Sequence, residues 1–489
     1  MFAQILQILL VPFGFVFIAY YAGVKWGAKA GWLSFMSLGY STVLTLLTAW
    51  QGGGQEFYDW RPIGFFGLNA DGLSIPLLFT IALLCTLMSV YSIPYMAHIV
   101  GTEKKQFGLY YALLLLYAVG MMGAVLATNL IEFYLFFELM LIPSYFLIAK
   151  WGYGDRDRIS FMYFMWTHIG ALAFLAGILS IGYLSGSFDL QNIVTSTIPS
   201  GLRAWIVILM VVGLLVKMAA FGLHIWLPHA HAEAPTPISA LLSPAMIGIG
   251  GYAIVRIVMT ILPTAVVEIS TALAIWAVIT MFYGGAMALV QDDIKRLLAY
   301  SSVSQMGYIL LGISSVEALG VSGSMLQYVS HGLGKGILFM MAGAIIIQAH
   351  GLRSIAKMGG LAYKMPITAT AAVIGFITIM GIPPTTGFIS EFLIFAGSFR
   401  EAFTLNSVLR IIISSLAVVS TALTAGYSLW TVKRVFFGQL PAELETVHEA
   451  PWTVTGPLLV LAVVSLILGI FPNLVEHLLL PAVRVILGG

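Results

Sequence analysis

Apolar runs of about 20 residues follow one another along almost the whole chain, separated by short polar or Gly/Pro-containing segments. About 20 apolar residues are what one helix needs to cross a bilayer. A soluble fold is excluded, because only 9% of the residues are charged, against about 25% in a soluble domain. We therefore predict an all-α polytopic membrane protein with about fourteen transmembrane helices. The predicted spans are 2–20, 31–50, 72–98, 107–127, 128–150, 159–184, 203–228, 236–262, 265–291, 297–314, 320–349, 365–397, 406–435 and 452–480.

Lysine and arginine gather in alternate loops, and cytoplasmic loops are the ones that collect cations. Fourteen of the 22 cations follow odd-numbered spans and five follow even-numbered spans, so we expect both termini to face the outside. The net charge of +2 and the lack of a polybasic arm argue against a nucleic-acid partner. The fourteen are Lys25, Lys29, Lys104, Lys105, Lys150, Arg156, Arg158, Lys295, Arg296, Arg353, Lys357, Lys364, Lys433 and Arg434, and the five are Arg61, Arg203, Arg400, Arg410 and Arg484.

The chain contains one cysteine, Cys85, within an apolar run. It can therefore build neither a disulfide framework nor a cysteine-ligated iron–sulfur cluster or c-type haem site. We expect no cofactor in this chain, and any electron transfer takes place in partner subunits.

Two predicted spans are interrupted in a similar way, the seventh at 222–228 and the twelfth at 381–384. Discontinuous helices at matching places in two halves indicate an inverted repeat, and irregular backbone is tolerated in a membrane only where it is buried in protein or lines a polar cavity. We therefore predict related units in spans four to eight and nine to thirteen. The predicted units are N-terminal helices over 1–106, a first half over 107–262, a second half over 263–437 and a C-terminal helix over 438–489.

Four predicted spans carry an ionisable residue in their apolar interior: Glu138, Lys217, Lys335 and Glu391. Such a residue costs about 2.5–3.5 kcal/mol on insertion scales and is retained for a partner or a function. Together the four indicate a row of titratable sites at mid-membrane depth, suited to proton transfer. The alternative is that the charges only pair and hold helices in register.

Histidine suits the same row because its ordinary pKa lies near neutrality. His331 precedes Lys335 by one helical turn, and His224 follows Lys217 by two turns on the same face, so each is a candidate site on the path.

Other polar residues have simpler interpretations. We interpret His168 as a satisfied interior histidine, and His229 and His231 fit no common zinc spacing, so no metal site is predicted. By physics alone, residues 291–296 form a charged cytoplasmic loop that leads into a hydroxyl-rich helix start at 300–307.

Short motifs follow one another between Asp71 and Arg434. They are DGLSIP at 71–76, FELMLIP at 137–143, KM at 217–218 leading to WLP at 226–228 and APT at 234–236, and KRLLAYSS at 295–302. In this order and spacing they resemble the antiporter-like proton-translocating subunits shared by complex I and Mrp-type sodium/proton antiporters.

The resemblance implies fourteen core helices, two inverted five-helix repeats and broken seventh and twelfth helices. It also implies that Glu138 and Lys217 form the coupling pair of the first half-channel and that Glu391 ends the second. A glutamate at this last position is typical of the M type, since L and N types usually carry lysine.

The chain departs from the family pattern at several positions. The lysine usual in the eighth helix is replaced by Gly248, whereas Lys335 after His331 resembles the L-type arrangement. We hypothesise that Lys335 with His331 replaces the absent lysine. Ala219 stands where a proline often follows the Lys-Met pair, and His229 stands where an acidic residue usually follows WLP.

The predicted function is therefore that of a proton-translocating subunit of a complex I-type oxidoreductase, in an energy-coupling membrane that is most simply a prokaryotic cell membrane. The expected partners are L-, N-, K- and H-type membrane subunits, with flavin, iron–sulfur clusters and a quinone-like acceptor in other subunits. The electron donor and the choice between proton and sodium stay open. The alternatives are an Mrp-type cation/proton antiporter, a subunit of a membrane-bound hydrogenase complex, and a scaffold whose charges hold helices together.

Overall fold

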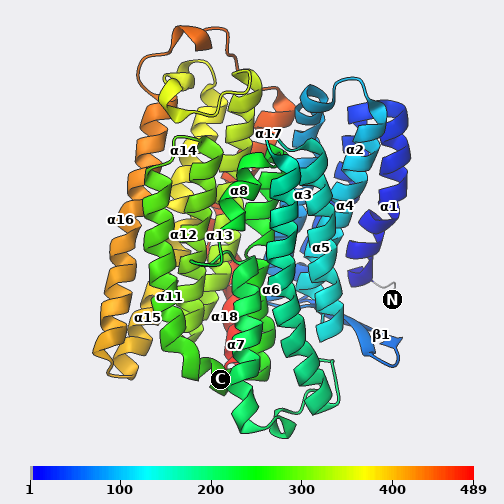
Figure 1. Cartoon of the computed structure of the whole chain (residues 1–489), viewed down its shortest axis with the longest axis vertical. Helices are drawn as coiled ribbons and strands as arrows, with labels where there is room; N and C mark the ends of the chain where they lie inside the picture. The colour runs from blue at the N-terminus through cyan, green and yellow to red at the C-terminus, as the bar shows by residue number, and fades with distance from the viewer. Residues whose placement is uncertain (1–3, 489) are drawn as a thin grey trace.

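The computed structural model describes residues 4–488, and long helices form most of it (Figure 1). Within this range twelve helical stretches are long and apolar enough to cross a membrane, and the first of them contains both α1 and α2. Residues 2 and 3 of the predicted first span, and the extreme ends of the predicted terminal units, lie outside the described range. The helices are α1 Gln4–Trp26, α2 Gly31–Trp50, α3 Ser74–Val100, α4 Lys104–Leu126, α5 Leu130–Trp151, α6 Arg156–Ser185, α7 Ser200–Lys217, α8 Trp226–Glu233, α9 Thr236–Leu241, α10 Ile249–Ala253, α11 Pro263–Leu289, α12 Ile294–Ser314, α13 Ala318–Gln348, α14 Pro366–Ile379, α15 Thr386–Thr404, α16 Val408–Phe436, α17 Trp452–Ile470 and α18 Asn473–Ile486.

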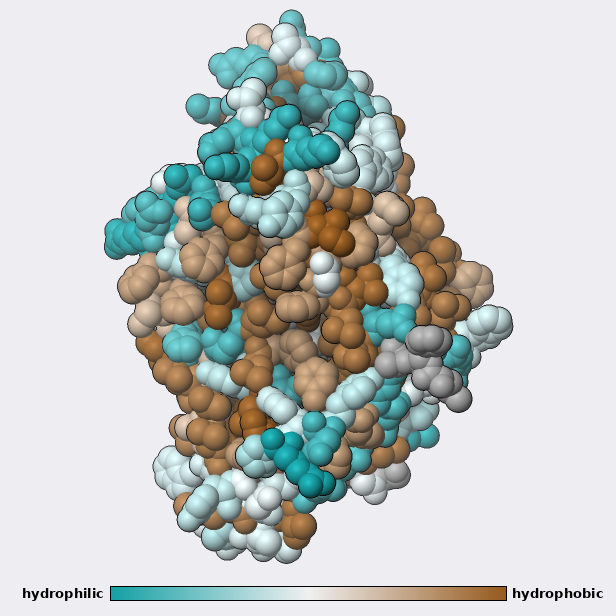
Figure 2. Space-filling model, turned by 90° about the vertical axis from the view of Figure 1, so that its right-hand side faces the viewer, coloured by the Kyte–Doolittle hydropathy of each residue, from teal (hydrophilic) through white to brown (hydrophobic). Residues whose placement is uncertain are grey.

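Hydrophobic side chains form a broad band around the middle of the molecule, with hydrophilic side chains gathered above and below it (Figure 2). Large apolar side chains of α1 and α2, such as Phe17 and Met36, are exposed. In water such a surface would drive association, whereas lipid tails solvate it. The chain is therefore an integral multi-pass membrane protein.

A β-hairpin interrupts the helices between α2 and α3. Strands β1 (Gly54–Trp60) and β2 (Gly64–Ala70) pair antiparallel, and the carboxylate of Glu56 accepts bonds from the N–H groups of Ile5 and Leu6 at 2.8 and 2.9 Å. These are unpaired donors of the first turn of α1. The sequence prediction of helices alone missed this hairpin, because a search for apolar runs does not detect a short aromatic-rich ribbon between two spans.

The seventh and twelfth predicted spans are both broken. α7 ends at Lys217 and α8 begins at Trp226, whereas α14 ends at Ile379 and α15 begins at Thr386. The first break therefore starts earlier than the predicted 222–228. In Figure 1, α8 lies above α7, and α14 lies above α15, so the chain passes through the two breaks in opposite directions.

Two other predicted spans are irregular as well. The eighth combines α9 and α10 with two π-helical segments, Leu242–Met246 and Ile254–Met259. The fourteenth was predicted as one helix over 452–480, but α17 ends at Ile470 and α18 begins at Asn473, after Pro472. The π segments were not predicted, because their residues are as apolar as those of an ordinary helix.

Helix α13 forms the centre of the bundle. It packs against α12, α14, α15, α17, α18 and α3, and 27 of its 31 residues, from Gly320 to Ile346, are buried without interruption. A helix that is buried all round must carry its polar side chains into the protein interior. Its ionisable residues therefore face other helices and not lipid.

Helices α1 and α4 approach closely at a pair of glycines. A Cβ atom at Gly23 would lie 2.4 Å from the Cα atom of Gly108, and a Cβ atom at Gly108 would lie 2.4 Å from the carbonyl oxygen of Tyr20. Small residues allow such backbone contact, which is how transmembrane helices gain packing energy in lipid.

We expect Gly23→Leu to weaken the contact between α1 and α4, because the new side chain has no space beside Gly108. Overpacking of this kind costs about 1–3 kcal/mol, so the apparent melting temperature of the solubilised complex should fall. The matched control is Gly14→Leu in the same helix, where no described heavy atom lies within 4 Å of the Cβ position. Equal melting temperatures for the two variants would contradict the close packing.

Candidate functional site

The break between α7 and α8 is held open by side chains that bond its free backbone groups. Indole N–H groups of three tryptophans donate to carbonyl oxygens in the last turn of α7 and within the break, and the Phe221 N–H donates to Thr280 Oγ1 at 3.1 Å. Ala219 and Gly222 adopt positive φ angles of 57° and 83°. The indole bonds are Trp226 to Val216 at 2.9 Å, Trp276 to Phe221 at 2.8 Å and Trp166 to Leu223 at 2.9 Å.

Lys217 is the last residue of α7 and lies directly before the break. Its side chain is 1% exposed, and its Nζ atom has no hydrogen-bond partner in the described chain. The ammonium lies 4.9 Å from the centroid of the Phe137 ring on α5. An aromatic face attracts a cation but accepts no proton, so Lys217 is held in place with its proton-carrying atom free.

Glu138 follows Phe137 on α5 and pairs with a histidine and not with Lys217. His168 Nδ1 on α6 lies 3.2 Å from Glu138 Oε2, whereas Glu138 Oε1 is buried without a partner in residues 4–488. Glu138 and Lys217 are within electrostatic range, but no ion pair within 4.0 Å joins them in the described residues. His168 is thus a satisfied histidine as interpreted, but its partner is one of the candidate site residues.

His224 lies within the break and is 6% exposed. Its Nδ1 atom accepts the N–H of Gly222 at 3.2 Å, which leaves Nε2 as the atom that carries the proton in a neutral ring. Tyr283 on α11 lies edge-on at 4.8 Å between ring centroids. The structure thus places His224 beyond Lys217, on the side of α11 and α12.

Lys335 lies on the central helix α13 and is completely buried. Its ammonium donates to the carbonyl oxygen of Leu298 at 3.0 Å and to the hydroxyl of Ser301, both on α12. His331 is one turn earlier on the same helix, 1% exposed, and its Nε2 atom has no partner among the residues described. The predicted pair is therefore present as two neighbouring buried bases.

Glu391 on α15 is 5% exposed and lies against the second break. A Cβ atom at Gly381 would lie 2.5 Å from Glu391 Oε2, and Gly381 has a positive φ of 65°, so this turn requires glycine twice over. Gln305 on α12 lies beside the carboxylate and donates to the carbonyl oxygen of Ile379 at 3.2 Å, where α14 ends.

Polar side chains stand between Lys335 and Glu391. Ser301 accepts the Lys335 bond, Gln305 lies beside the carboxylate, and the buried Tyr427 hydroxyl of α16 lies near both but has no hydrogen-bond partner in the described residues. Gln327 on α13 donates to Gln305 Oε1 at 2.5 Å. Hydroxyl and amide groups in such a series can carry a proton or orient water between two basic sites.

Comparison with known proteins fits this geometry. Residues 127–422 match the family model described as NADH:quinone oxidoreductase/Mrp antiporter, transmembrane region. The F(420)H(2) dehydrogenase subunit M of Methanosarcina mazei is 33% identical over 487 residues, which cover 95% of this chain and 94% of that protein. The chain belongs to this family.

Two solved structures extend the likeness to the whole fold. A chain of respiratory complex I from Thermus thermophilus with bound NADH is 26% identical, has a TM-score of 0.86 and covers 99% of this chain and 100% of its own length. A chain of the Mrp complex from Dietzia sp. has a TM-score of 0.88 at 22% identity, covers 100% of this chain and 98% of its own length, and shows the same fold alone. The protein is thus an antiporter-like membrane subunit of the complex I M type.

In this antiporter-like subunit Gly248 is enclosed by an aromatic ring from α13. A Cβ atom at Gly248 would lie 2.2 Å from Tyr328 Cδ2, and the Tyr328 hydroxyl donates to the carbonyl oxygen of Ala245 at 2.6 Å. Gly248 lies between the two π-helical segments. Any side chain there would collide with a ring that belongs to the helix of Lys335.

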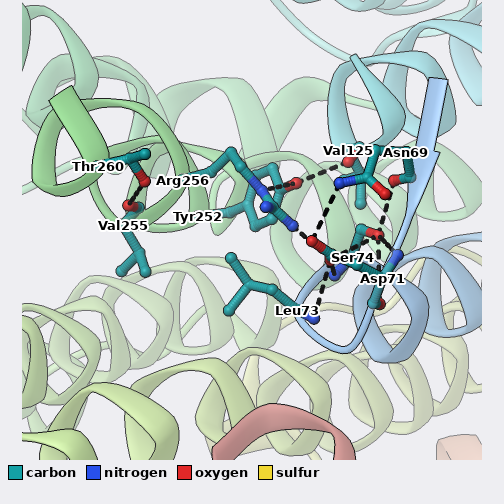
Figure 3. Close-up of polar contacts among 9 residues, drawn as sticks. All are labelled: Asn69, Asp71, Leu73, Ser74, Val125, Tyr252, Val255, Arg256 and Thr260. Atoms are coloured by element: carbon teal, nitrogen blue, oxygen red, sulfur yellow. Dashed lines mark hydrogen bonds and ion pairs between the residues drawn. The ribbon is translucent and has the colours of Figure 1, made fainter. Parts of the chain in front are cut away.

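The first family motif, residues 71–76, forms an ion pair with the end of the eighth span. Asp71 Oδ1 pairs with Arg256 Nη2 at 2.5 Å and accepts the N–H groups of Leu73 and Ser74, as Figure 3 shows. Burial raises the pKa of the Asp71 carboxyl, but the charge and bonds of Arg256 outweigh burial and hold this pKa below its ordinary value. The pair joins the start of α3 to the second π segment.

Sequence reasoning missed several buried ionisable residues. Lys295 was counted among the cytoplasmic loop cations, yet it is completely buried in the first turn of α12. His231 was considered only for a metal site, yet it is completely buried with both ring nitrogens unpaired in the described residues. Arg410, counted as a loop flank, is also buried at 2% exposure. A helix boundary predicted three residues late at 297 hid Lys295.

We expect Gly248→Lys to fail as a restoration of the family lysine, because the Tyr328 ring occupies the space. The variant should reduce subunit content in the membrane and lower the melting temperature, in line with overpacking costs of about 1–3 kcal/mol or more. Adding Tyr328→Ala should recover some of the loss. Tyr328→Phe with Gly248→Lys is the control, since it keeps the ring. Recovery by Tyr328→Phe would show that the hydroxyl bond and not the ring excludes the lysine.

Proposed function

We propose that this chain moves protons across the membrane as the M-type subunit of a complex I-type oxidoreductase, through Glu138, Lys217, His224, His331, Lys335 and Glu391. The observation that carries the proposal is the placement of unpaired buried ionisable groups at both helix breaks and on the central helix between them. Lys217, His331 and Glu391 each keep a buried proton-carrying atom without a partner in residues 4–488. A purely structural charge would be fully paired, because an unpaired one is costly in the protein interior.

Two related units of opposite orientation support this proposal. We assign residues 107–262 to a first half-channel and 263–437 to a second, flanked by 1–106 and 438–489. In the first unit the longer half-helix α7 precedes the break, whereas in the second the longer half-helix α15 follows it. This exchange of order is what an inverted five-helix repeat predicts, and it favours a count of fourteen crossings.

In the first half-channel Glu138 would alternate between two bases. It is paired with His168 here, while Lys217 is within electrostatic range and has no hydrogen bond in the described structure. Two unit charges about 4 Å apart interact by about 4 kcal/mol at an effective dielectric constant of 20. Pairing with Glu138 would raise the proton affinity of Lys217 and load the lysine, and a change back to the histidine partner would lower that affinity enough to release the proton to His224.

In the second half-channel Lys335 and His331 would hold the proton at mid-depth. Between Lys335 and Glu391, whose carboxylate lies at the second break, stand Ser301, Gln305 and the unpaired Tyr427 hydroxyl, and bonds from that hydroxyl to the other two would complete the path. The steric exclusion of a side chain at Gly248 supports the hypothesis that Lys335 with His331 takes the place of the usual lysine.

Electron transfer would take place in partner subunits. The Methanosarcina relative is named as a subunit of an F(420)H(2) dehydrogenase, and the Thermus structure is of respiratory complex I with bound NADH. We propose by analogy that flavin, iron–sulfur clusters and a quinone-like acceptor belong to other subunits, and that L-, N-, K- and H-type subunits adjoin this one. The cation distribution supports both termini outside, and the prokaryotic sources of these two similar proteins support a prokaryotic cell membrane.

An Mrp-type antiporter without redox coupling shares this fold, since the Dietzia chain superposes at least as well as the complex I chain. The 33% identity over almost the whole chain to a dehydrogenase subunit favours the redox-coupled function. A membrane-bound hydrogenase subunit would need the same helices. A scaffold would also need them, but it would not need unpaired bases at the breaks.

We expect Lys217→Ala to abolish redox-driven proton uptake while the complex still assembles. Loss of a relay site raises the barrier by about the 2.5–3.5 kcal/mol that a charge costs at mid-membrane, so proton flux should fall about 70- to 370-fold. Inverted vesicles are given NADH and reduced F420 in separate assays, and proton uptake is compared with donor oxidation.

The matched control is Lys29→Ala, which removes a lysine from the short connection between α1 and α2, outside the proposed path. Normal uptake by an assembled Lys217→Ala complex would show that Lys217 is structural. Loss of assembly in both Lys217→Ala and Lys217→Arg would favour the scaffold alternative.

We expect Lys335→Met to stop proton uptake as strongly as Lys217→Ala does. The central helix α13 lies between the two breaks, and Lys335 is its one lysine. Methionine keeps a long flexible side chain but carries no proton. The readout is the ratio of protons taken up to electrons transferred, with subunit content measured in parallel. An unchanged ratio would exclude Lys335 as the substitute for the missing eighth-helix lysine.

A further inference from the structure

His231 and Lys295 are buried ionisable residues that the proposed path does not use. His231 lies in α8, and its ring stacks on Phe339 of α13 at 4.9 Å between centroids and 22° between planes. Both ring nitrogens are buried and unpaired within the described range. Buried polar atoms are nearly always satisfied, and an imidazole has two of them to satisfy. The position therefore needs an explanation beyond packing.

Lys295 lies in the first turn of α12, which packs against α8. Its ammonium donates to the carbonyl oxygen of Ala234, the residue that caps the C-terminus of α8. A helix C-terminus stabilises a cation through the helix dipole. The Tyr153 ring lies 5.3 Å from the same ammonium. Lys295 is thus fixed at the end of the short helix that carries His231.

His231 and Lys295 interact electrostatically with each other and with the pair His331 and Lys335 on α13. The charges of both Lys295 and Lys335 act on His231, and those of Lys335 and His231 act on His331. His231 is three residues before Ala234, which accepts the Lys295 bond, and its ring stacks on Phe339, four residues after Lys335, so it lies between the lysine of α12 and the bases of α13. An imidazole in this position can take a proton on one nitrogen and give one from the other.

A carboxylate connects this group with the surface. Glu233 is two residues beyond His231, half-buried, and within range of Lys295, Arg353 and Arg296. Its carboxylate lies against Gly154, whose Cβ position would be 2.6 Å from Glu233 Oε2. Arg353 pairs with Asp293 at 2.6 Å and lies on the same Tyr153 ring as Lys295. These residues are on the side of the cation-rich loops, where Lys295, Arg296 and Arg353 were counted.

We propose that Glu233, Lys295 and His231 form the proton inlet from the cation-rich side to the His331–Lys335 centre. The inference rests on the proposed function and adds the entry point of the central site. Glu233 takes a proton from water and passes it to Lys295 after the ammonium has given one to His231. His231 passes its other N–H proton to the unpaired Nε2 atom of His331, which gives it to Lys335 once that ammonium has released its own proton towards Glu391, so each step leaves the number of protons in the group balanced.

A Lys295→Arg variant distinguishes a proton-transfer role of Lys295 from a structural one. Lys295→Arg keeps the cation and a donor for Ala234 but does not release a proton, because a guanidinium stays charged. Lys295→Met removes both the charge and the donor. His231→Phe keeps a ring to stack on Phe339 but has no nitrogen. His448→Phe, at an exposed site in the loop before α17, is the matched control.

The experiment measures protons taken up per electron in inverted vesicles of the assembled complex, with NADH and reduced F420 as donors. We expect about a tenfold fall or more for Lys295→Arg, Lys295→Met and His231→Phe, and no change for His448→Phe. A normal ratio in Lys295→Arg together with a loss in Lys295→Met would make Lys295 a structural clamp and overturn the inlet. If His231→Phe does not assemble, His231→Gln tests the same step, and a normal ratio there overturns it too.

The same vesicles separate failure of the inlet from failure of the proposed function. Normal ratios in the inlet variants with collapsed ratios in Lys217→Ala and Lys335→Met would remove the inlet and leave the path intact. Normal ratios in all of them would overturn both.

A second measurement tests the side from which protons enter. The single cysteine is first removed by Cys85→Ser, and Glu233→Cys is added in that background. The new cysteine should react with a membrane-impermeant maleimide from the cation-rich side only, and reaction from the opposite side only would contradict the assigned entry side.

Discussion

Backbone hydrogen bonding in lipid is the constraint on which the rest of this structure depends. A peptide group in the membrane interior must have a partner, so a chain can leave the helix there only where side chains supply one. Three indole N–H groups and a threonine hydroxyl supply those partners at the first break, and Gln305 supplies one at the end of α14. With its backbone groups paired in this way, the break can lie beside the buried ionisable groups Lys217 and His224.

The direction of each half-helix matches the sign of the charge beside its break. α7 ends at the first break, and the negative end of its dipole meets Lys217, its last residue. α15 begins at the second break, and Glu391 lies in its second turn with its carboxylate turned back against Gly381. A helical side chain leans towards the N-terminus, which brings that carboxylate closer to the positive end of the dipole. A cation in one half and an anion in the other therefore follow from reversing the order of the two half-helices.

The sequence was sufficient to predict features that are visible in the hydropathy profile. Glycine and proline at 222–228 and 381–384 interrupt apolar runs, and Glu138, Lys217, Lys335 and Glu391 are conspicuous within them. It did not predict pairings, because Glu138 can reach His168 or Lys217 and only packing decides between them. It also missed Lys295, since a lysine one residue inside a helix start is indistinguishable by composition from one in the preceding loop. The β-hairpin and the π segments left no hydropathy signal at all.

The missing eighth-helix lysine shows how one helix can take over a function from another. A lysine on the eighth span and the Tyr328 ring on α13 cannot occupy the same space, because even a Cβ atom at Gly248 would collide with the ring. The tyrosine is two turns before Lys335 on one continuous buried helix, so the residue that fills the vacant space and the residue that supplies the base are carried by the same rigid element. Restoring the usual lysine alone would therefore displace α13, and with it Lys335 and the Ser301 contact that starts the path to Glu391. The two arrangements are alternatives in packing as well as in chemistry, which is why an exchange between them requires coordinated changes on both helices.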